Sequence, residues 1–459
     1  MSLTCTARSR MLRTMREYDR FIFDSYAVTG GGRTVELCYT MDDELRFVET
    51  IGLPAPIADP EEPRVKAALF ALHLAAGTSY YKTFAPTRME VRSGQLSEED
   101  AAFWTTVYEK GMGEFFYKNT IDWRGRINFP VTGGSRPRSN APARRAGKRK
   151  LLVPVGGGKD SLVTVELLKQ AGHDCALLRK APHPAIDAVA KTTGLPLLEV
   201  TQAFSPLLFE LNKAGAMNGH IPFTAHLSAL ATLVAIGTGH DAVVLSNERS
   251  ASEGNLEYLG MEVNHQWSKS LEFERLWQAY SARAIDPGVD CFSLLRPLSE
   301  LQIVQLFSMA PQYFSQFTSC NANWKFFEPK THSSLWCGKC PKCAFAYCLL
   351  SAFLPVETVI PIFGGDLYDR EDLLGLYREL LGIEGHKPFE CVGTAEEVAA
   401  AMLLARKRGD LRRSLALKMF EAEALPGIAD PDAVVERSLT AVGDHAIPRE
   451  FLSVLHAPH

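Results

Sequence analysis

The chain has 459 residues, of which 46% are hydrophobic and 22% charged, with a formal net charge of −4. This composition is typical of a globular protein with room for two or three domains, and the small acidic excess argues against nucleic-acid binding. No apolar run approaches the ~20 residues of a membrane span, and residues 1–21 lack the apolar core of a signal peptide, so we expect a cytoplasmic protein with no membrane partner.

Residues 1–130 predict an N-terminal α+β domain. Two apolar segments, "RTVELCYTM" and "LRFVETIGL", flank the polar turn "DDE" and predict a pair of strands. The segment "EPRVKAALFALHLAAGTSYYKTF" predicts a helix that runs into Gly77. Residues 131–149 are rich in Gly, Pro and Arg without apolar periodicity, which predicts a flexible basic linker or, alternatively, a contact for a polyanion.

From residue 150 onward, strands and helices alternate. Predicted strands at 150–155, 174–180, 196–202 and 241–248 are separated by predicted helices at 160–172, 183–194 and 225–239. This βαβα order predicts a parallel sheet with helices on both faces, and such sheets bind ligands at the carboxyl ends of their strands. We assign residues 150–350 to this α/β domain and residues 351–459 to a mainly helical C-terminal region.

The loop "PVGGGKDS", residues 154–161, links the first of these strands to a helix. Its backbone N–H groups and the helix start predict a site for an anion such as phosphate. A Walker A loop is excluded because Val153 stands where its first glycine should be and Asp160 follows the lysine in place of Ser or Thr. The dinucleotide G-x-G-x-x-G pattern is excluded because Ser161 occupies the last glycine position.

The loop resembles the S-G-G-x-D-S loop of the PP-loop ATP pyrophosphatases. The matching residues are Gly157, Gly158, Asp160 and Ser161, whereas Gly156 stands where that family has serine. The resemblance implies a PP-loop core that binds ATP, cuts it between the α and β phosphates and attaches AMP to a carboxylate or carbonyl oxygen. A glycine-rich turn without a ligand is the alternative.

The resemblance also implies roles for individual residues. The amides of Gly156, Gly157 and Gly158, together with Ser161, would hold the pyrophosphate, and Asp160 would help to place Mg²⁺. Lys159 would stabilise developing charge, although an ordinary solvated lysine fits this position equally well.

A second polar segment, "LSNERSASEGN" at residues 245–255, follows another predicted strand. Its candidate nucleotide-binding residues are Ser246, Asn247, Glu248 and Arg249. Arg249 suits bidentate binding of phosphate or carboxylate, and Glu248 or Glu253 could bind Mg²⁺ or act as a general base. His220, in "NGHIPFTAH", is a further candidate. A polar surface turn and a structural histidine are the alternatives.

A cysteine cluster forms the third motif. Cys337, Cys340 and Cys343 follow C-x-x-C-x-x-C spacing, and Cys320 could supply a fourth thiolate. Four thiolates fit structural Zn²⁺, and they would also fit an iron–sulfur cluster. Free thiols near a helix start are the remaining possibility, and Cys348 falls on the following apolar helix and belongs to its core.

The order of these motifs along the chain resembles the MurL family of UDP-N-acetylmuramoyl-L-alanyl-L-glutamate epimerases. The resemblance implies that the substrate is UDP-MurNAc-L-Ala-L-Glu, a precursor of peptidoglycan. Its terminal L-glutamate would be inverted through an acyl-adenylate, with release of AMP and pyrophosphate, because adenylation removes the carboxylate charge and acidifies the Cα–H. Another PP-loop adenylating enzyme and a non-catalytic nucleotide-binding protein are the alternatives.

Epimerisation requires two acid/base groups on opposite faces of Cα. The candidates are His220, Glu253, Cys291 and Cys320, with Lys159 and Asp160 acting at the phosphate end. The segment "GTSYYKTFAP" is a possible contact for the UDP-sugar or, equally, a buried aromatic patch. The sequence does not indicate an oligomeric state.

Overall fold

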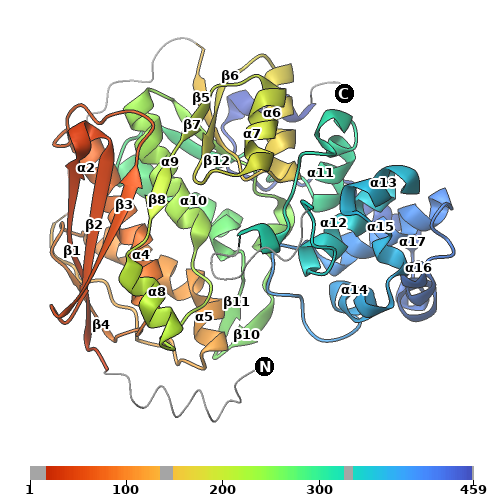
Figure 1. Ribbon diagram of the computed structural model, residues 1–459, viewed down its shortest axis with the longest axis horizontal. Helices are drawn as coiled ribbons and strands as arrows, with labels where there is room; N and C mark the ends of the chain where they lie inside the picture. The colour runs from red at the N-terminus through yellow and green to blue at the C-terminus, as the bar shows by residue number, and fades with distance from the viewer. Residues whose placement is uncertain (1–16, 135–147, 325–333, 457–459) are drawn as a thin grey trace.

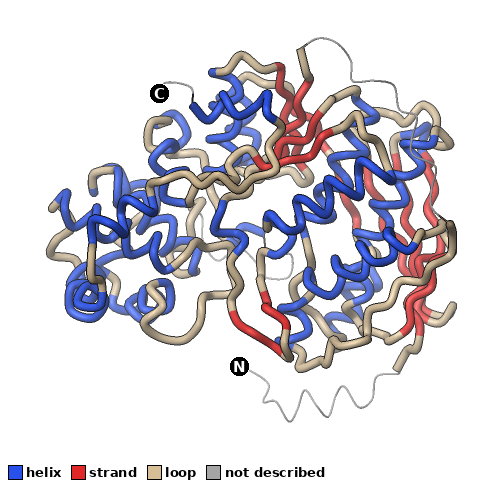
Figure 2. The backbone as a smooth tube through the Cα atoms, turned by 180° about the vertical axis from the view of Figure 1, so that it is seen from behind, coloured by secondary structure: helices blue, strands red, loops and turns tan. Residues whose placement is uncertain are grey.

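The computed structural model describes residues 17–134, 148–324 and 334–456. Two groups of strands are separated by helices, and a lobe of helices lies on the opposite side of the molecule from the first group (Figures 1 and 2). Most of the predicted linker, residues 135–147, lies outside the described residues. Within the described parts of the chain, none of the helices combines the length and apolar character needed to span a membrane.

The first sheet has the strand order β4-β1-β2-β3-β8. Its strands are β1 (Arg20–Thr29), β2 (Thr34–Met41), β3 (Leu45–Gly52), β4 (Arg88–Val91) and β8 (Thr201–Ala203). The predicted strand pair is confirmed, since β2 and β3 pair antiparallel from Thr34–Gly52 to Met41–Leu45. Asp42 and Asp43 form the turn with positive φ angles of 51° and 64°, a conformation that short polar side chains tolerate.

Helices cover the first sheet and connect it to the second. They are α2 (Pro63–Ala76), α3 (Thr78–Tyr81), α4 (Glu98–Gly111) and α5 (Gly113–Lys118). The predicted helix before Gly77 is therefore confirmed as α2. Tyr80 and Tyr81 of α3 are fully buried, and the Tyr80 hydroxyl donates a hydrogen bond to Glu49 at 2.9 Å. These two side chains form a buried aromatic patch with their neighbours.

The second sheet is entirely parallel, as the βαβα pattern predicted, with the order β12-β9-β5-β6-β7. Its strands are β5 (Lys150–Pro154), β6 (Asp174–Arg179), β7 (Leu197–Glu199), β9 (Ala242–Leu245) and β12 (Asp290–Ser293). The accompanying helices are α6 (Lys159–Gln170), α7 (Pro184–Thr193), α8 (Pro206–Lys213), α9 (Phe223–Thr238), α10 (Leu271–Ala284) and α11 (Glu300–Phe307).

Alternate residues of the parallel strands enter two different cores, because successive side chains point to opposite faces. Leu151 and Val153 pack in the core that contains α6 and α11. Leu152, between them, packs in the core that contains α9 and the first sheet. The parallel sheet is therefore buried on both faces, as its nearly continuous apolar strands require.

The predicted strand 196–202 is divided between the two sheets. Residues 197–199 form β7 at the edge of the parallel sheet, and residues 201–203 form β8, which pairs antiparallel with β3. The neighbour β6 ends at Arg179, which pairs with Glu199, so beyond Val200 the chain has no further partner in the parallel sheet. Residues 201–203 pair with the edge of β3 instead. The division of the chain into four domains stays a prediction.

The remaining strands, β10 (Leu256–Tyr258) and β11 (Met261–Val263), form a hairpin. The C-terminal lobe contains α12 (Pro341–Phe353), α13 (Val356–Phe363), α14 (Leu374–Leu380), α15 (Ala395–Arg408), α16 (Leu415–Met419) and α17 (Pro431–Ser438). Cys348 on α12 is fully buried, as predicted for a core residue. The helix α15 starts with a capping box in which Thr394 and Glu397 bond each other's backbone N–H.

Candidate active site

The glycine loop lies where the strand order of the parallel sheet reverses. From β5 the chain moves outward on one side to β6 and β7, and it then returns to β9 on the other side of β5. The loops after β5 and β9 therefore leave neighbouring strands in opposite directions, which is where open α/β sheets bind ligands. This edge brings residues 156–161 close to residues 246–249.

The loop itself exposes backbone groups at a helix start. Gly157 has a φ of +79°, a conformation that favours glycine, and Gly158 is the N-cap residue of α6. The Ser161 hydroxyl donates to the Gly158 carbonyl at 3.1 Å. A Cβ atom built on Gly156 would meet no atom within 4 Å, so the structure has room for the serine that the PP-loop pattern expects there.

Lys159 is not a solvated lysine. Its side chain is buried, and its ammonium group contacts the carboxylates of Asp160 and Glu300. Burial by itself would lower the pKa of Lys159, but these two carboxylates hold it above its ordinary value. Lys159 therefore carries its positive charge inside the protein.

Two acidic side chains contact this lysine, and a third, Glu248, lies close enough to Glu300 to affect its pKa. The pKa of Glu300 is raised by burial and by the nearby charges of Asp160 and Glu248, which outweigh the effect of Lys159. The pKa of Asp160 is lowered despite its burial, chiefly by Lys159. Carboxylate oxygens next to an anion site fit a hard cation such as Mg²⁺. Asp160, Glu248 and Glu300 could each supply a ligand, although among the described residues their carboxylate oxygens do not all lie within 4.8 Å of one another.

The loop after β9 supplies polar groups to the same edge. Asn247 donates a hydrogen bond to the Ser293 hydroxyl at the end of β12, at 2.9 Å. Within the described parts of the chain, the buried Ser246 hydroxyl has no hydrogen-bond partner, which suits a group reserved for a ligand. Arg249 instead extends its side chain to the Thr440 carbonyl at 3.0 Å, so binding a phosphate would require it to turn.

The four predicted cysteines come together beside the glycine loop. The Sγ–Sγ distances are 3.9 Å for Cys320–Cys340, 3.7 Å for Cys337–Cys343 and 3.5 Å for Cys340–Cys343. A tetrahedral ion with bonds of about 2.3 Å to sulfur places its ligands about 3.8 Å apart. Gly338, with a φ of +66°, turns the chain between the second and third ligands. The arrangement fits one tetrahedral metal ion with four thiolate ligands.

The segment before Cys320 connects this cluster to the glycine loop. The Thr318 N–H donates to the Gly157 carbonyl at 2.8 Å, and the Thr318 hydroxyl accepts a hydrogen bond from the Cys320 N–H at 3.2 Å. A metal ion bound by the cysteines would therefore hold the segment that packs against the loop.

Three other predicted residues lie apart from the loop. Glu253 is exposed, just after the short 3₁₀ helix η2 (Arg249–Ser252). Cys291 is buried in β12, and burial raises its pKa to about 12, so it is a poor base. His220 packs against His265 with ring centroids 4.2 Å apart, and burial lowers its pKa to about 3. The roles predicted for these residues stay predictions.

Several ionisable residues near the site were not predicted from the sequence. They are Glu300, Lys269, His265, Glu114 and Cys391, and none of them belongs to a recognisable motif. Lys269 is linked to the loop because the charges of Cys391, Glu248 and Asp160 together raise its pKa against the effect of burial. The only available signal was the S-x-x-Q capping box at Ser299, which predicts that a helix begins at Glu300.

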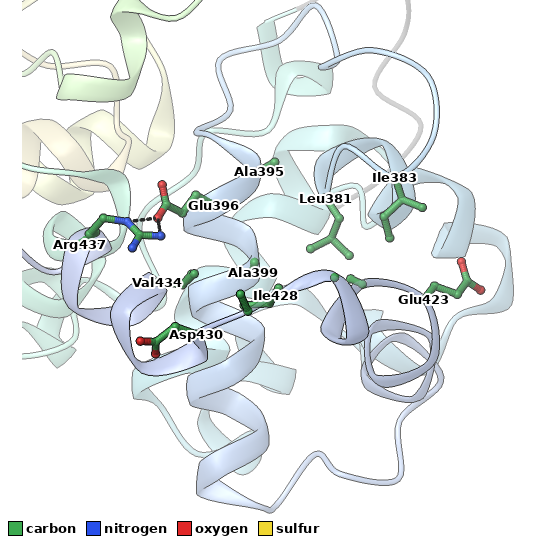
Figure 3. A pocket seen from close by; sticks show the side chains of 13 residues that line it. Leu381, Ile383, Ala395, Glu396, Ala399, Glu423, Ile428, Asp430, Val434 and Arg437 are labelled. Atoms are coloured by element: carbon green, nitrogen blue, oxygen red, sulfur yellow. Dashed lines mark hydrogen bonds and ion pairs between the residues drawn. The ribbon is translucent and has the colours of Figure 1, made fainter.

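A pocket of about 670 Å³ lies elsewhere, in the C-terminal lobe (Figure 3). Its lining comes from residues 381–437, including the ion pair between Arg437 and Glu396. It contains no residue of the glycine loop or of the cysteine cluster. This pocket is therefore separate from the candidate active site.

The fold and the site together define a class: a parallel α/β protein with an anion-binding glycine loop at the strand-order switch. Residues 13–294 match the MurL N-terminal domain, and residues 316–434 match the MurL C-terminal domain. The two matches cover most of the chain, so the protein belongs to the MurL family.

Full-length relatives agree with this assignment. The chain is 40% identical over 449 residues to the UDP-N-acetyl-alpha-D-muramoyl-L-alanyl-L-glutamate epimerase of a Micromonospora species, covering 96% of this chain and 98% of that protein. It is 40% identical over 416 residues to the epimerase of the same name from Xanthomonas oryzae pv. oryzae, covering 90% and 91%. The epimerase of that name from Salinispora tropica is 39% identical over 447 residues, covering 96% of each chain.

Proposed function

We propose that this protein is an ATP-dependent epimerase that converts the terminal L-glutamate of UDP-MurNAc-L-Ala-L-Glu to D-glutamate in peptidoglycan biosynthesis. The observation that supports this most directly is the 40% identity, over 96% of the chain, to a relative named as that epimerase. The glycine loop at the strand-order switch supports the use of ATP, and a reaction that consumes ATP belongs in the cytoplasm.

The chemistry explains why an epimerase would need a phosphate loop. Removing the α-proton from a free carboxylate would place a second negative charge on an anion. Transfer of AMP to the α-carboxylate, with loss of pyrophosphate, cancels the first charge and acidifies the Cα–H. A base then removes the proton from one face, an acid returns a proton to the other, and water releases AMP and the D-glutamyl product.

In this proposal several residues of the glycine loop and its surroundings bind the phosphate end of ATP. The glycine amides and the start of α6 would bind the departing pyrophosphate, with the positive end of the helix facing it. Asp160, Glu248 and Glu300 would hold Mg²⁺, which neutralises phosphate charge. The buried cation of Lys159 would lower the pKa of Asp160 and hold the side chains of Asp160 and Glu300 in place.

We further propose that Cys320, Cys337, Cys340 and Cys343 bind a structural Zn²⁺. The sulfur spacing and the two hydrogen bonds of Thr318 support this proposal. The ion would fix residues 318–320 against the glycine loop and take no part in the proton transfers.

Substrate-dependent nucleotide turnover tests the proposal. The purified protein, ATP and Mg²⁺ are incubated with UDP-MurNAc-L-Ala-L-Glu, and AMP and pyrophosphate are quantified while ²H from D₂O is followed at the glutamyl Cα by mass spectrometry. We expect equal amounts of AMP and pyrophosphate together with ²H incorporation, and neither with free L-glutamate. Turnover that yields ADP, or epimerisation that proceeds without ATP, would refute the adenylation route.

A further inference from the structure

Cys391 lies on a segment that crosses from the C-terminal lobe to the residues on either side of the β10–β11 hairpin. This segment joins α14 to α15, and side chains from 255–266 hold it in place. Asn255 donates hydrogen bonds to the carbonyls of Lys387 and Pro388, at 3.1 and 3.0 Å. Gln266 donates to the Val392 carbonyl at 3.3 Å. The cysteine is thus anchored on both sides, with a side chain that is only partly buried.

The thiol of Cys391 contacts two cationic side chains. It lies close enough to His265 and Lys269 to affect the pKa of both, and the ammonium group of Lys269 also donates a hydrogen bond to the side chain of Gln266 at 3.4 Å. On its other side, the Nδ1 atom of His265 hydrogen-bonds the Glu114 carboxylate at the start of α5. Three parts of the chain that are far apart in sequence therefore build a continuous Cys–His–Glu arrangement with a lysine beside the sulfur.

The charges of this cluster favour a thiolate. Burial alone would raise the pKa of Cys391, but Lys269, Lys342 and His265 lower it to about 5. Hydrogen bonds to Cys391 and Glu114 raise the pKa of His265 to about 9 despite its burial. Near neutral pH the cluster therefore holds a thiolate next to an imidazolium, whereas an ordinary cysteine would carry a neutral thiol.

The cluster is also connected to the glycine loop. Lys269 lies close enough to both the Cys391 thiol and the Asp160 carboxylate of the loop for each of them to raise its pKa. Arg296 is fully buried and donates hydrogen bonds to the backbone carbonyls of Glu248 and Lys269. These two bonds connect the loop after β9 to the turn that carries Lys269. Lys269 therefore stands between the charges of the loop and the thiol of Cys391.

We propose that Cys391 is one of the two acid/base groups at the glutamyl Cα, a role that rests on the proposed function. The thiolate accepts the Cα proton, and the electrons of the broken C–H bond move onto the acyl oxygen as an enolate. Lys269 stabilises that oxygen by charge, and a second group protonates the opposite face. Glu114 is a positioning residue, because it keeps His265 charged and oriented toward the sulfur.

The same cluster does not suit a metal ion. Ligand atoms of Glu114, His220 and His265 lie within 4.8 Å of one another. However, the His265 ring already serves two partners, Glu114 and Cys391, and its raised pKa reflects a ring that holds both protons. An ion would have to displace a proton that the surrounding acids stabilise.

The proposal is tested with Cys391→Ser in the full-length protein. We expect the variant to form AMP and pyrophosphate with UDP-MurNAc-L-Ala-L-Glu, because the loop is untouched, while epimerisation falls by about 10²-fold or more. Cys38→Ser, a buried thiol in the first sheet whose sulfur accepts from Arg46, is the matched control and should keep both activities.

Each outcome separates the two proposals. If the wild-type protein epimerises its substrate without forming AMP, the adenylation proposal fails while Cys391 is still testable through the variant. If Cys391→Ser epimerises within threefold of wild type, the role of Cys391 is refuted. Loss of AMP formation in a folded Cys391→Ser variant would also refute it, since the thiol would then be needed before proton transfer.

Thiol alkylation provides a readout that does not depend on turnover. Iodoacetamide reacts with thiolates, so the rate at Cys391, followed by peptide mass spectrometry, should reach its plateau above about pH 6. In Lys269→Met the midpoint should move to higher pH, because a cation next to the sulfur is lost. A midpoint near that of an ordinary thiol, about 8.5, in the wild-type protein would contradict the proposed thiolate.

Discussion

Lys159 of the glycine loop and Glu300 at the start of α11 form a buried ion pair across the candidate active site. The two residues are 141 positions apart, and Asp160 contacts the same lysine. Their charges hold the first turn of α6 against the first turn of α11. The pair therefore connects the anion-binding loop to the rest of the core.

Replacing Lys159 by Met should destabilise the protein strongly. The substitution nearly keeps the length of the side chain but leaves the buried Glu300 and the partly exposed Asp160 without their cation, and loss of one partner from a buried pair typically costs about 3–5 kcal/mol. Urea denaturation followed by circular dichroism measures this loss. Lys169→Met on the same helix is the matched control, because its ion pair with Glu166 at 3.3 Å is partly exposed and should contribute less than about 1 kcal/mol. An equal loss of unfolding free energy in the two variants would show that the buried ion pair stabilises the protein no more than the exposed one.

The two glycines at positions 156 and 157 should respond differently to substitution. Gly156→Ser meets no neighbouring atom and should fold normally, with a lower KM for ATP because a hydroxyl is added to the phosphate site. Gly157→Ser places a side chain at a φ of +79° and should cost about 1–2 kcal/mol and weaken ATP binding. Thermal unfolding and ATP-dependent AMP formation measure both effects. A destabilised Gly156→Ser would contradict the open space seen at that position.

Removing metal from the cysteine cluster should affect both stability and ATP binding. We expect elemental analysis of the purified protein to find about one zinc per chain. A strong chelator should then lower the Tm and raise the KM for ATP, because residues 318–320 connect the cluster to the Gly157 carbonyl. Cys337→Ser should reproduce this behaviour, whereas Cys38→Ser should not. A full complement of iron would instead favour an iron–sulfur cluster.

The epimerisation rate should depend on pH through the Cys391–His265 pair. Activity should rise as Cys391 loses its proton near pH 5 and fall as His265 loses its proton near pH 9, which produces a bell-shaped profile of kcat/KM. Glu114→Gln removes the carboxylate that raises the pKa of His265, so the alkaline limb should move to lower pH. A parallel loss of rate at every pH would show that Glu114 has only a structural role.

Local patterns were sufficient to predict much of the fold. The hairpin of β2 and β3, the helix α2 and the alternation that forms the parallel sheet all depend on residues near one another in sequence. The segment 196–202, "PLLEVTQ", was predicted as one strand. Its division between β7 and β8 depends on where β6 ends and where the edge of β3 lies, and neither is encoded within the segment.

The candidate site shows the same contrast. The sequence by itself determined the glycine loop and the cysteine spacing, because a tight turn at a helix start and a C-x-x-C knuckle each need particular residues a few positions apart. Only the tertiary structure brought Glu300 to Lys159 and Cys391 to His265. Those pairs are 141 and about 126 residues apart, and their pKa values depend on burial and on charges from other elements. Isolated acidic, histidine and cysteine side chains carry no such information until the fold surrounds them.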